Sequence, residues 1–297
     1  MTKHISIIFF TLLLFTGLIN GCQNQFKATV KSDQNSVLWQ IKKDGYPTSY
    51  LFGTMHLINR SHYDFSKNLT AILKSSDKII MELGGMPNPI QAMLLMTNKK
   101  GTLKDIFTDH QWQEILAFYK EEFEMTESKF ISTYNNFKPF FLFQSLAQSY
   151  FSSDAESYDM NIMQMARENN IEVIGLETIE EQIGFFDAIP DTTMANMIME
   201  SLESYQADAA EFEKLQALYA VENIEALIPL MKEQSPEFLK FEDIFLSDRN
   251  RKWIPTLEGL LAENSCLIAV GAAHLFEENG LISLLKQKGF TVNPIKK

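Results

Sequence analysis

The stretch Phe52-Gly53-Thr54-Met55-His56-Leu57 decides the fold predicted for this chain, and a similar stretch, Val270-Gly271-Ala272-Ala273-His274-Leu275, returns near its other end. In both, an apolar run typical of a buried strand leads into Gly-x-x-His-Leu, and a helical pattern follows. The glycine lets the chain turn sharply where the strand ends, so that the histidine projects from the rim of the sheet. Ligands bind at this rim in open α/β sheets. We therefore expect a fold with two related halves that bring His56 and His274 face to face.

Two further predicted strands end in acidic residues. The apolar run from Lys78 to Leu83 places Glu82 at its end, and the run from Ile171 to Glu177 ends in Glu177 itself. A capping box, Thr178-x-x-Glu181, then begins the next helix. Because the carboxyl ends of parallel strands meet at one edge, both acids are expected near the two histidines.

The remaining pattern predicts an α/β fold with a largely parallel central sheet. Residues 37–41 and 49–52 flank an Asp-Gly turn and are typical of a hairpin. Further helices are expected over 65–75, 157–170, 247–261 (kinked at Pro255) and 281–288, with a short closing strand at 290–292. Two mostly helical stretches, roughly 88–150 and 192–240, would form an insertion or cap over the sheet, and the aromatic run from Pro139 to Leu146 is expected in its core.

The amino terminus has the pattern of an export signal. Lys3 gives a short positive region, and the apolar run from Ile5 to Ile19 is too short to span a membrane. It ends in Leu18-Ile19-Asn20-Gly21-Cys22, which resembles a bacterial lipobox with cleavage before Cys22. We therefore expect a lipoprotein signal peptide (1–21), a lipidated Cys22 opening a polar tether (22–36), and one domain (37–297) on the periplasmic or cell-surface side. An ordinary signal peptide or an uncleaved anchor is the alternative.

Cysteine usage and charge exclude several classes of function. The chain has two cysteines, and lipidation of Cys22 would leave Cys266 without an intrachain partner, as a small buried apolar residue. The net charge of −12 repels phosphate backbones and anionic headgroups, so nucleic acid is not an expected partner and membrane attachment would come from the lipid. The His-Glu-x-x-His helix and the Gly-x-Ser-x-Gly elbow are both missing from the sequence.

Paired histidines beside carboxylates support two kinds of chemistry. They can hold a divalent metal with an open position for water, whose pKa then falls to about 7. Alternatively, one imidazole oriented by a carboxylate can act as a general base without a metal.

The motifs together resemble the TraB/GumN family. The resemblance covers essentially the whole of the predicted mature chain. The family is related to the Tiki metalloproteases and, more distantly, to the erythromycin-esterase and ChaN-like proteins. It rests on residues 51–57, Met81-Glu82-Leu83, Gly175-Leu176-Glu177-Thr178-x-x-Glu181-Gln182, Asp248-Arg249-Asn250-x-x-Trp253, and Val270-Gly271-Ala272-Ala273-His274-Leu275-x-x-x-x-Gly280-Leu281. Glu277 stands where relatives often carry glycine, which alters the loop after His274.

The resemblance implies a site between the two Gly-x-x-His motifs. His56, Glu82 and His274 would hold a divalent metal, manganese or cobalt by resemblance, with zinc as an alternative. Arg249 would stabilise an oxyanion or fix a carboxylate. Glu177 and Asp159 would supply further acidic groups.

Three functions are compatible with these residues. The first is an exported, lipid-anchored, metal-dependent hydrolase, with peptides as the expected substrate by analogy. The second is a metal-free, esterase-like hydrolase with His56 or His274 as general base. The third is a lipoprotein that sequesters a peptide or small molecule without turnover. The sequence leaves the substrate and the oligomeric state open.

Overall fold

The computed structural model describes residues 35–233 and 239–297. The predicted signal peptide, Cys22 and nearly all of the predicted tether lie outside these residues. None of the helices in the described ranges combines the length and the apolar composition that crossing a bilayer requires.

A six-stranded mixed sheet forms the centre of the fold, with strand order β4-β3-β5-β2-β1-β6. The four strands β4, β3, β5 and β2 run parallel, and β1 and β6 are added antiparallel at one side. The bounds are β1 Leu38–Lys42, β2 Ser49–Thr54, β3 Lys78–Leu83, β4 Glu172–Glu177, β5 Cys266–Gly271 and β6 Thr291–Ile295. The predicted α/β class with a largely parallel sheet is confirmed.

The strand order places the two Gly-x-x-His motifs side by side. β2 and β5 are adjacent parallel strands, with Gly53 opposite Val270 and Thr54 opposite Gly271. On the other side of β5 lies β3, which carries Glu82, and beyond it β4 ends with Glu177 opposite Leu83. All four candidate residues therefore come from the carboxyl ends of four neighbouring parallel strands.

The glycines of the two motifs serve a different purpose from the predicted one. Neither Gly53 nor Gly271 has the positive φ that a sharp glycine turn would use. A Cβ on Gly53 would lie 2.9 Å from a side-chain carbon of Leu275 and 3.0 Å from the Cα of Ala272. Close packing of one motif against the other is therefore what requires glycine here.

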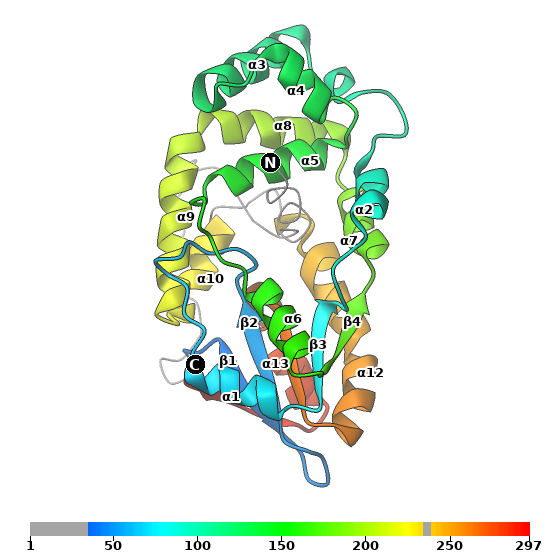
Figure 1. Ribbon diagram of the computed structural model, residues 1–297, viewed down its shortest axis with the longest axis vertical. Coiled ribbons are helices and arrows are strands. Elements are labelled where there is room, and N and C mark those ends of the chain that lie inside the picture. Colours follow the sequence, from blue (N-terminus) through cyan, green and yellow to red (C-terminus); the bar gives the residue numbers. More distant parts are fainter. Residues whose placement is uncertain (1–34, 234–238) are drawn as a thin grey trace.

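Helices cover both faces of the sheet and extend above it (Figure 1). α1 packs beside α6, and α12 packs beside α13 and continues through Pro255. The other α-helices and three short helical segments complete the order along the chain. The bounds are α1 Lys67–Ser75, α2 Pro89–Met96, η2 Leu103–Ile106, α3 Asp109–Phe123, α4 Glu127–Tyr134, α5 Pro139–Ser149, α6 Tyr158–Glu168, α7 Ile179–Phe186, α8 Asp191–Glu203, α9 Tyr205–Ala220, α10 Ile224–Glu233, η3 Asp243–Ser247, α12 Asp248–Glu263, η4 Ala272–His274 and α13 Leu281–Gln287.

The buried apolar residues form two clusters. One is built on the sheet, with its flanking helices and with α9 and α10. The other lies in the helical cap, where α5 packs against α8 and Phe140 stacks on Phe186 with ring centroids 3.5 Å apart (Figure 1). The aromatic helix α5 is therefore core, as its composition predicts. Cys266 is buried and carries a free thiol.

The described chain enters the fold close to the rim that carries the histidines. The Val37 carbonyl accepts a hydrogen bond from the Gly53 amide at 2.8 Å. The Ser36 hydroxyl lies within hydrogen-bond distance of Glu222, just after α9, and of the Ile295 carbonyl in β6, and the Val37 amide donates to Glu222. The first described residues are thus held by three separate elements.

Candidate active site

His56 is held by a carboxylate that comes from the first turn of α6. Its Nδ1 lies 2.9 Å from Oδ2 of Asp159, and both side chains are buried. The Thr54 hydroxyl donates to the same carboxylate at 3.3 Å. Ser157, and not Asp159, caps α6, so Asp159 is free to face the histidine. With Nδ1 committed to Asp159, Nε2 of His56 faces Glu82.

His274 is completely buried and is oriented by Asn250, the third residue of α12. The Asn250 amide nitrogen donates to the carbonyls of His274 and Asn279, so its oxygen is the acceptor for Nδ1 of His274 at 2.7 Å. Nδ1 therefore carries the proton in this network, and Nε2 keeps a lone pair. Arg249 Nη1 donates to that Nε2 at 3.2 Å, and the ring of Trp253 lies against the imidazole.

Glu82 brings the two histidines together. Its Oε1 accepts a hydrogen bond from the Gly271 amide at 2.9 Å and lies 3.7 Å from Nε2 of His56 and 3.9 Å from Nε2 of His274. A Cβ on Gly271 would lie 3.2 Å from Nε2 of His56 and 3.4 Å from this oxygen. The absence of a side chain at Gly271 therefore keeps the space between the carboxylate and the imidazole open.

Arg249 joins the two strand-end acids. Its Nη2 donates to Oε2 of Glu82 and to Oε2 of Glu177, both at 2.7 Å, and its Nε donates to Glu177 Oε1 at 2.9 Å. Trp253 Nε1 also donates to Glu177. The Glu177 carboxylate therefore contacts Arg249 and not the histidines. Of the two roles expected for Arg249, this geometry corresponds to fixing a carboxylate.

The surroundings of the two histidines shift their pKa values in opposite directions. Burial by itself lowers the pKa of His56, but Asp159 and then Glu82 outweigh it and raise that pKa to about 9. Burial and the Arg249 charge lower the pKa of His274 to about 3. Burial opposes ionisation of Glu82, yet Arg249 and the two imidazoles hold its pKa well below the usual range. At neutral pH the site therefore has a protonated His56, a neutral His274 and an ionised Glu82.

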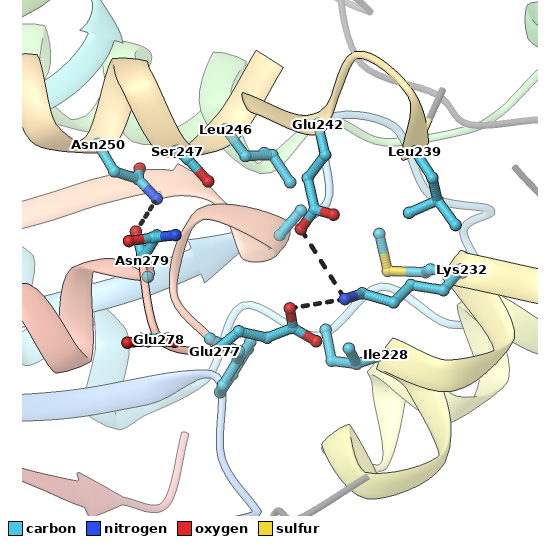
Figure 2. A pocket seen from close by; sticks show the side chains of 14 residues that line it. Ile228, Lys232, Leu239, Glu242, Leu246, Ser247, Asn250, Glu277, Glu278 and Asn279 are labelled. Atoms are coloured by element: carbon cyan, nitrogen blue, oxygen red, sulfur yellow. Dashed lines mark hydrogen bonds and ion pairs between the residues drawn. The ribbon is translucent and has the colours of Figure 1, made fainter. Parts of the chain in front are cut away.

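Two cavities open beside these residues. The smaller, about 60 Å³, is lined by both histidines together with α9 and α10. The larger, about 220 Å³, lies between α10, the start of α12 and the loop after His274; Lys232 crosses its wall to reach Glu242 and Glu277 (Figure 2). Met231 and Ala273 line both cavities. The two spaces therefore form neighbouring compartments next to the histidines.

The structure brings the sequence-predicted site residues into one network, with Glu177 on its outer side behind Arg249. His62 and His110 lie apart, paired with Glu213 and Glu114. Asn250 and Gln182 are site residues that the sequence reasoning did not assign; Gln182 donates to Glu82 and Glu177. Both residues occur inside the motifs quoted above. The signal that could have identified them was an uncharged polar residue in a helix that follows or precedes a strand of the site.

The donor set matches a divalent metal in chemistry, but the separations between the donor atoms are longer than a bound ion would set. The site contains three buried carboxylates, from Glu82, Glu177 and Asp159, and one guanidinium, so it has two negative charges in excess when both histidines are neutral and one when His56 is protonated. Ligands about 2.1 Å from one tetrahedral ion lie roughly 3.4 Å apart. The nitrogen–oxygen separations of 3.7 and 3.9 Å exceed this by a few tenths of an ångström. Within the described residues, no group of three His, Cys, Asp or Glu is already positioned as a metal-ligand cluster.

Comparisons with known proteins agree with the motifs. A model of the TraB/PrgY/gumN family matches residues 37–294. The chain is 20% identical over 343 residues to "Metalloprotease TIKI homolog" of Amphimedon queenslandica, a match that covers 97% of this chain and 67% of that protein. It is 23% identical over 250 residues to "Uncharacterized protein YbaP" of Shigella flexneri, covering 83% and 90% respectively. No solved structure matches the chain at a significant level.

Proposed function

The chain belongs to the TraB/PrgY/gumN family. We propose that it is a metal-dependent hydrolase that cleaves the peptide bonds of a substrate, and that its active site lies between the two Gly-x-x-His motifs. One observation carries the proposal: two imidazole Nε2 atoms face the same Glu82 oxygen in a buried cluster whose three carboxylates outnumber its one guanidinium. A relative named as a metalloprotease supports the reaction class.

His56, His274 and Glu82 would hold the ion. When bound, a divalent metal supplies a Lewis acid and lowers the pKa of a coordinated water. To hold the ion, His56 would have to lose its Nε2 proton, while Asp159 keeps the ring oriented through Nδ1. Asn250 fixes the His274 ring in the same way through Nδ1.

The remaining residues orient the carboxylate and shield the charges. Arg249 and the Gly271 amide hold the two oxygens of Glu82 in place, so that the carboxylate cannot rotate away. For the ion to bind His274, Arg249 must give up its contact with Nε2, and it retains Glu82 and Glu177 as partners. Hydrolysis then adds the elements of water across the amide: hydroxide to the carbonyl carbon and a proton to the departing nitrogen.

Metal binding and peptide cleavage test the proposal. Purified protein is expected to bind manganese, cobalt or zinc in a one-to-one ratio and to cleave members of a broad peptide library with added metal. The double variant His56→Ala/His274→Ala should lose both properties. His62→Ala is the matched control, because His62 pairs with Glu213 away from the site. A wild-type protein that neither binds metal nor cleaves any peptide would refute the proposal.

The Asp159–His56 pair also favours a second candidate, a metal-free hydrolase in which an oriented imidazole moves the proton. The pKa of about 9 counts against His56 as a base at neutral pH, because the ring is then already protonated. The lone pair of His274 is occupied by Arg249. Activity that survives exhaustive chelation would nevertheless establish this second function.

We further propose that the protein acts as an exported lipoprotein, anchored through Cys22. The support is the leader pattern alone. Cys22→Ser should move the protein from the membrane fraction to the soluble fraction and abolish labelling by a palmitate analogue. Unchanged membrane attachment in this variant would contradict lipidation at Cys22.

A further inference from the structure

The smaller cavity has a chemical character different from that of the residues at its base. Both histidines and the ends of β2 and β5 form one side of it. The other side is made by helices α9 and α10, which contribute Phe212, Leu215, Tyr219, Leu227 and Met231. An apolar wall therefore stands directly against a buried, charged cluster.

The hydroxyl groups that line this cavity are already bonded. The Tyr219 hydroxyl donates to the Gly53 carbonyl at 2.8 Å, and the Thr54 hydroxyl donates to Asp159. A polar group entering the cavity would give up its hydrogen bonds to water and find no hydroxyl partner there, at a cost in free energy. An apolar group would lose nothing on entry and would gain from leaving water. The α9–α10 side of the cavity therefore favours an apolar group, whereas the opposite side presents His56 and His274.

The size of the cavity limits the ligand further. A water-sized group needs about 10–15 Å³ of such space, so roughly four non-hydrogen atoms fit into about 60 Å³. This is the size of a leucine, isoleucine or methionine side chain. Met231 belongs to the wall, and its flexible thioether can adapt to branched or unbranched shapes.

The position of the cavity identifies what part of the substrate enters it. Because Met231 and Ala273 also line the larger cavity, a chain lying in the larger space can place one side chain in the smaller one. That side chain would then lie beside His56 and His274. We infer that this cavity is the specificity pocket of the enzyme and takes a medium-sized aliphatic side chain next to the peptide bond that is cleaved.

This inference rests on the proposed function, and binding can test it separately from cleavage. The probes are blocked pentapeptides, acetyl-Gly-Gly-X-Gly-Gly-amide, with X as Gly, Ala, Leu, Met, Phe, Asp or Lys. Calorimetry on the full chain with and without manganese gives affinity, and mass spectrometry gives cleavage. We expect Leu and Met peptides to bind at least about 10-fold more tightly than Gly, Asp or Lys peptides.

Variants locate the preference in this cavity. Leu227→Ala enlarges it and should shift the Phe-to-Leu affinity ratio about 5–10-fold toward Phe. Met231→Phe fills it and should remove the advantage of Leu over Gly. Leu257→Ala is the matched control. Leu257 is as fully buried as Leu227 and belongs to the same apolar cluster, but it does not line the cavity. The relative affinities of this variant for the peptides should therefore match those of the wild type.

The outcomes separate the two proposals. Selective binding without cleavage would sustain the pocket and refute the hydrolase. Cleavage without side-chain preference would sustain the hydrolase and refute the pocket. Equal binding of all peptides, no binding of any, or the same shift in Leu257→Ala as in Leu227→Ala would also overturn the inference.

Discussion

At the scale of single residues, the site depends on groups that never need to touch a substrate. Asp159 and Asn250 each hold one imidazole through Nδ1 and leave Nε2 directed toward Glu82. Histidine ligands in metal sites are commonly oriented in this way, and loss of the orienting group weakens metal binding without removing a ligand. Both residues therefore allow tests that keep the proposed ligands intact.

Asn250→Ala is expected to weaken metal affinity about 10–100-fold, because His274 loses the acceptor that fixes its ring. Competition with a fluorescent chelator measures this change. Asn161→Ala is the matched control, since the Asn161 side-chain amide donates to Tyr63 and Glu156 and to neither histidine. Equal affinities of Asn250→Ala and wild type would show that His274 needs no orientation or binds no metal.

Asp159→Asn should lower the pKa of His56 from about 9, because the carboxylate is the largest influence that opposes the effect of burial. A histidine whose folded pKa is raised stabilises the fold fully below its unfolded pKa, about 6.5, and this contribution disappears as pH rises through 9. In chelator, wild-type unfolding free energy should therefore fall between pH 6.5 and 9. The variant should show a flatter profile, measured by denaturant unfolding; identical slopes would contradict the assignment.

At the scale of elements, β3 and β4 approach each other closely just where Glu82 and Glu177 project. A Cβ on Gly84 would lie 2.6 Å from the backbone nitrogen of Gly175, so there is no room for a side chain between the two strand ends. Near this backbone contact, Arg249 reaches both acids, with Nη2 2.7 Å from Glu82 and from Glu177.

Gly175→Ala is therefore expected to destabilise the protein by about 1–3 kcal/mol and to weaken metal binding, because the strands must separate. Gly184→Ala is the control: Gly184 lies within α7, has nothing within 4 Å of its Cβ position, and should gain about 0.5–1 kcal/mol. Denaturant unfolding measures both. A neutral Gly175→Ala would mean that the close approach is not maintained in solution.

The elements that carry the site were largely predictable, because strand ends leave a local signal. The run from Lys78 to Leu83 is β3 itself, and the positions of His56, Glu82, Glu177 and His274 follow from strand ends. The grouping of Asn250 with His274 was not predictable, because it depends on how α12 packs against η4, a contact between distant segments. The purpose of Gly53 was misjudged for the same reason: its close neighbours come from the other motif.

At the scale of the whole molecule, the proposed ligands come from three strands that are joined only through the folded sheet. An ion bound by His56, Glu82 and His274 would therefore connect β2, β3 and β5 and stabilise the native state relative to the unfolded one. The rest of the stabilising packing is apolar and is divided between the cluster on the sheet and the cluster in the helical cap.

Saturating metal, at about 100 times its Kd, should stabilise the fold by about 2.7 kcal/mol and raise Tm by several degrees. Chelator should reverse the shift, and His56→Ala/His274→Ala should show none. Differential scanning calorimetry is the measurement. A shift of the same size in the double variant would assign the stabilisation to ions bound elsewhere on this acidic protein.

The hydrogen bonds that hold Ser36 and Val37 in the fold bear on how the domain would be oriented at a membrane. Ser36 and Val37 lie at the edge of the sheet that carries the candidate site, since Val37 bonds to the strand that leads to His56. If residues 22–36 link the domain to a bilayer, they reach at most about 50 Å when stretched out. The candidate site would then be confined to a thin layer over the lipid, and polypeptides held close to that surface would meet it far more often than freely diffusing ones.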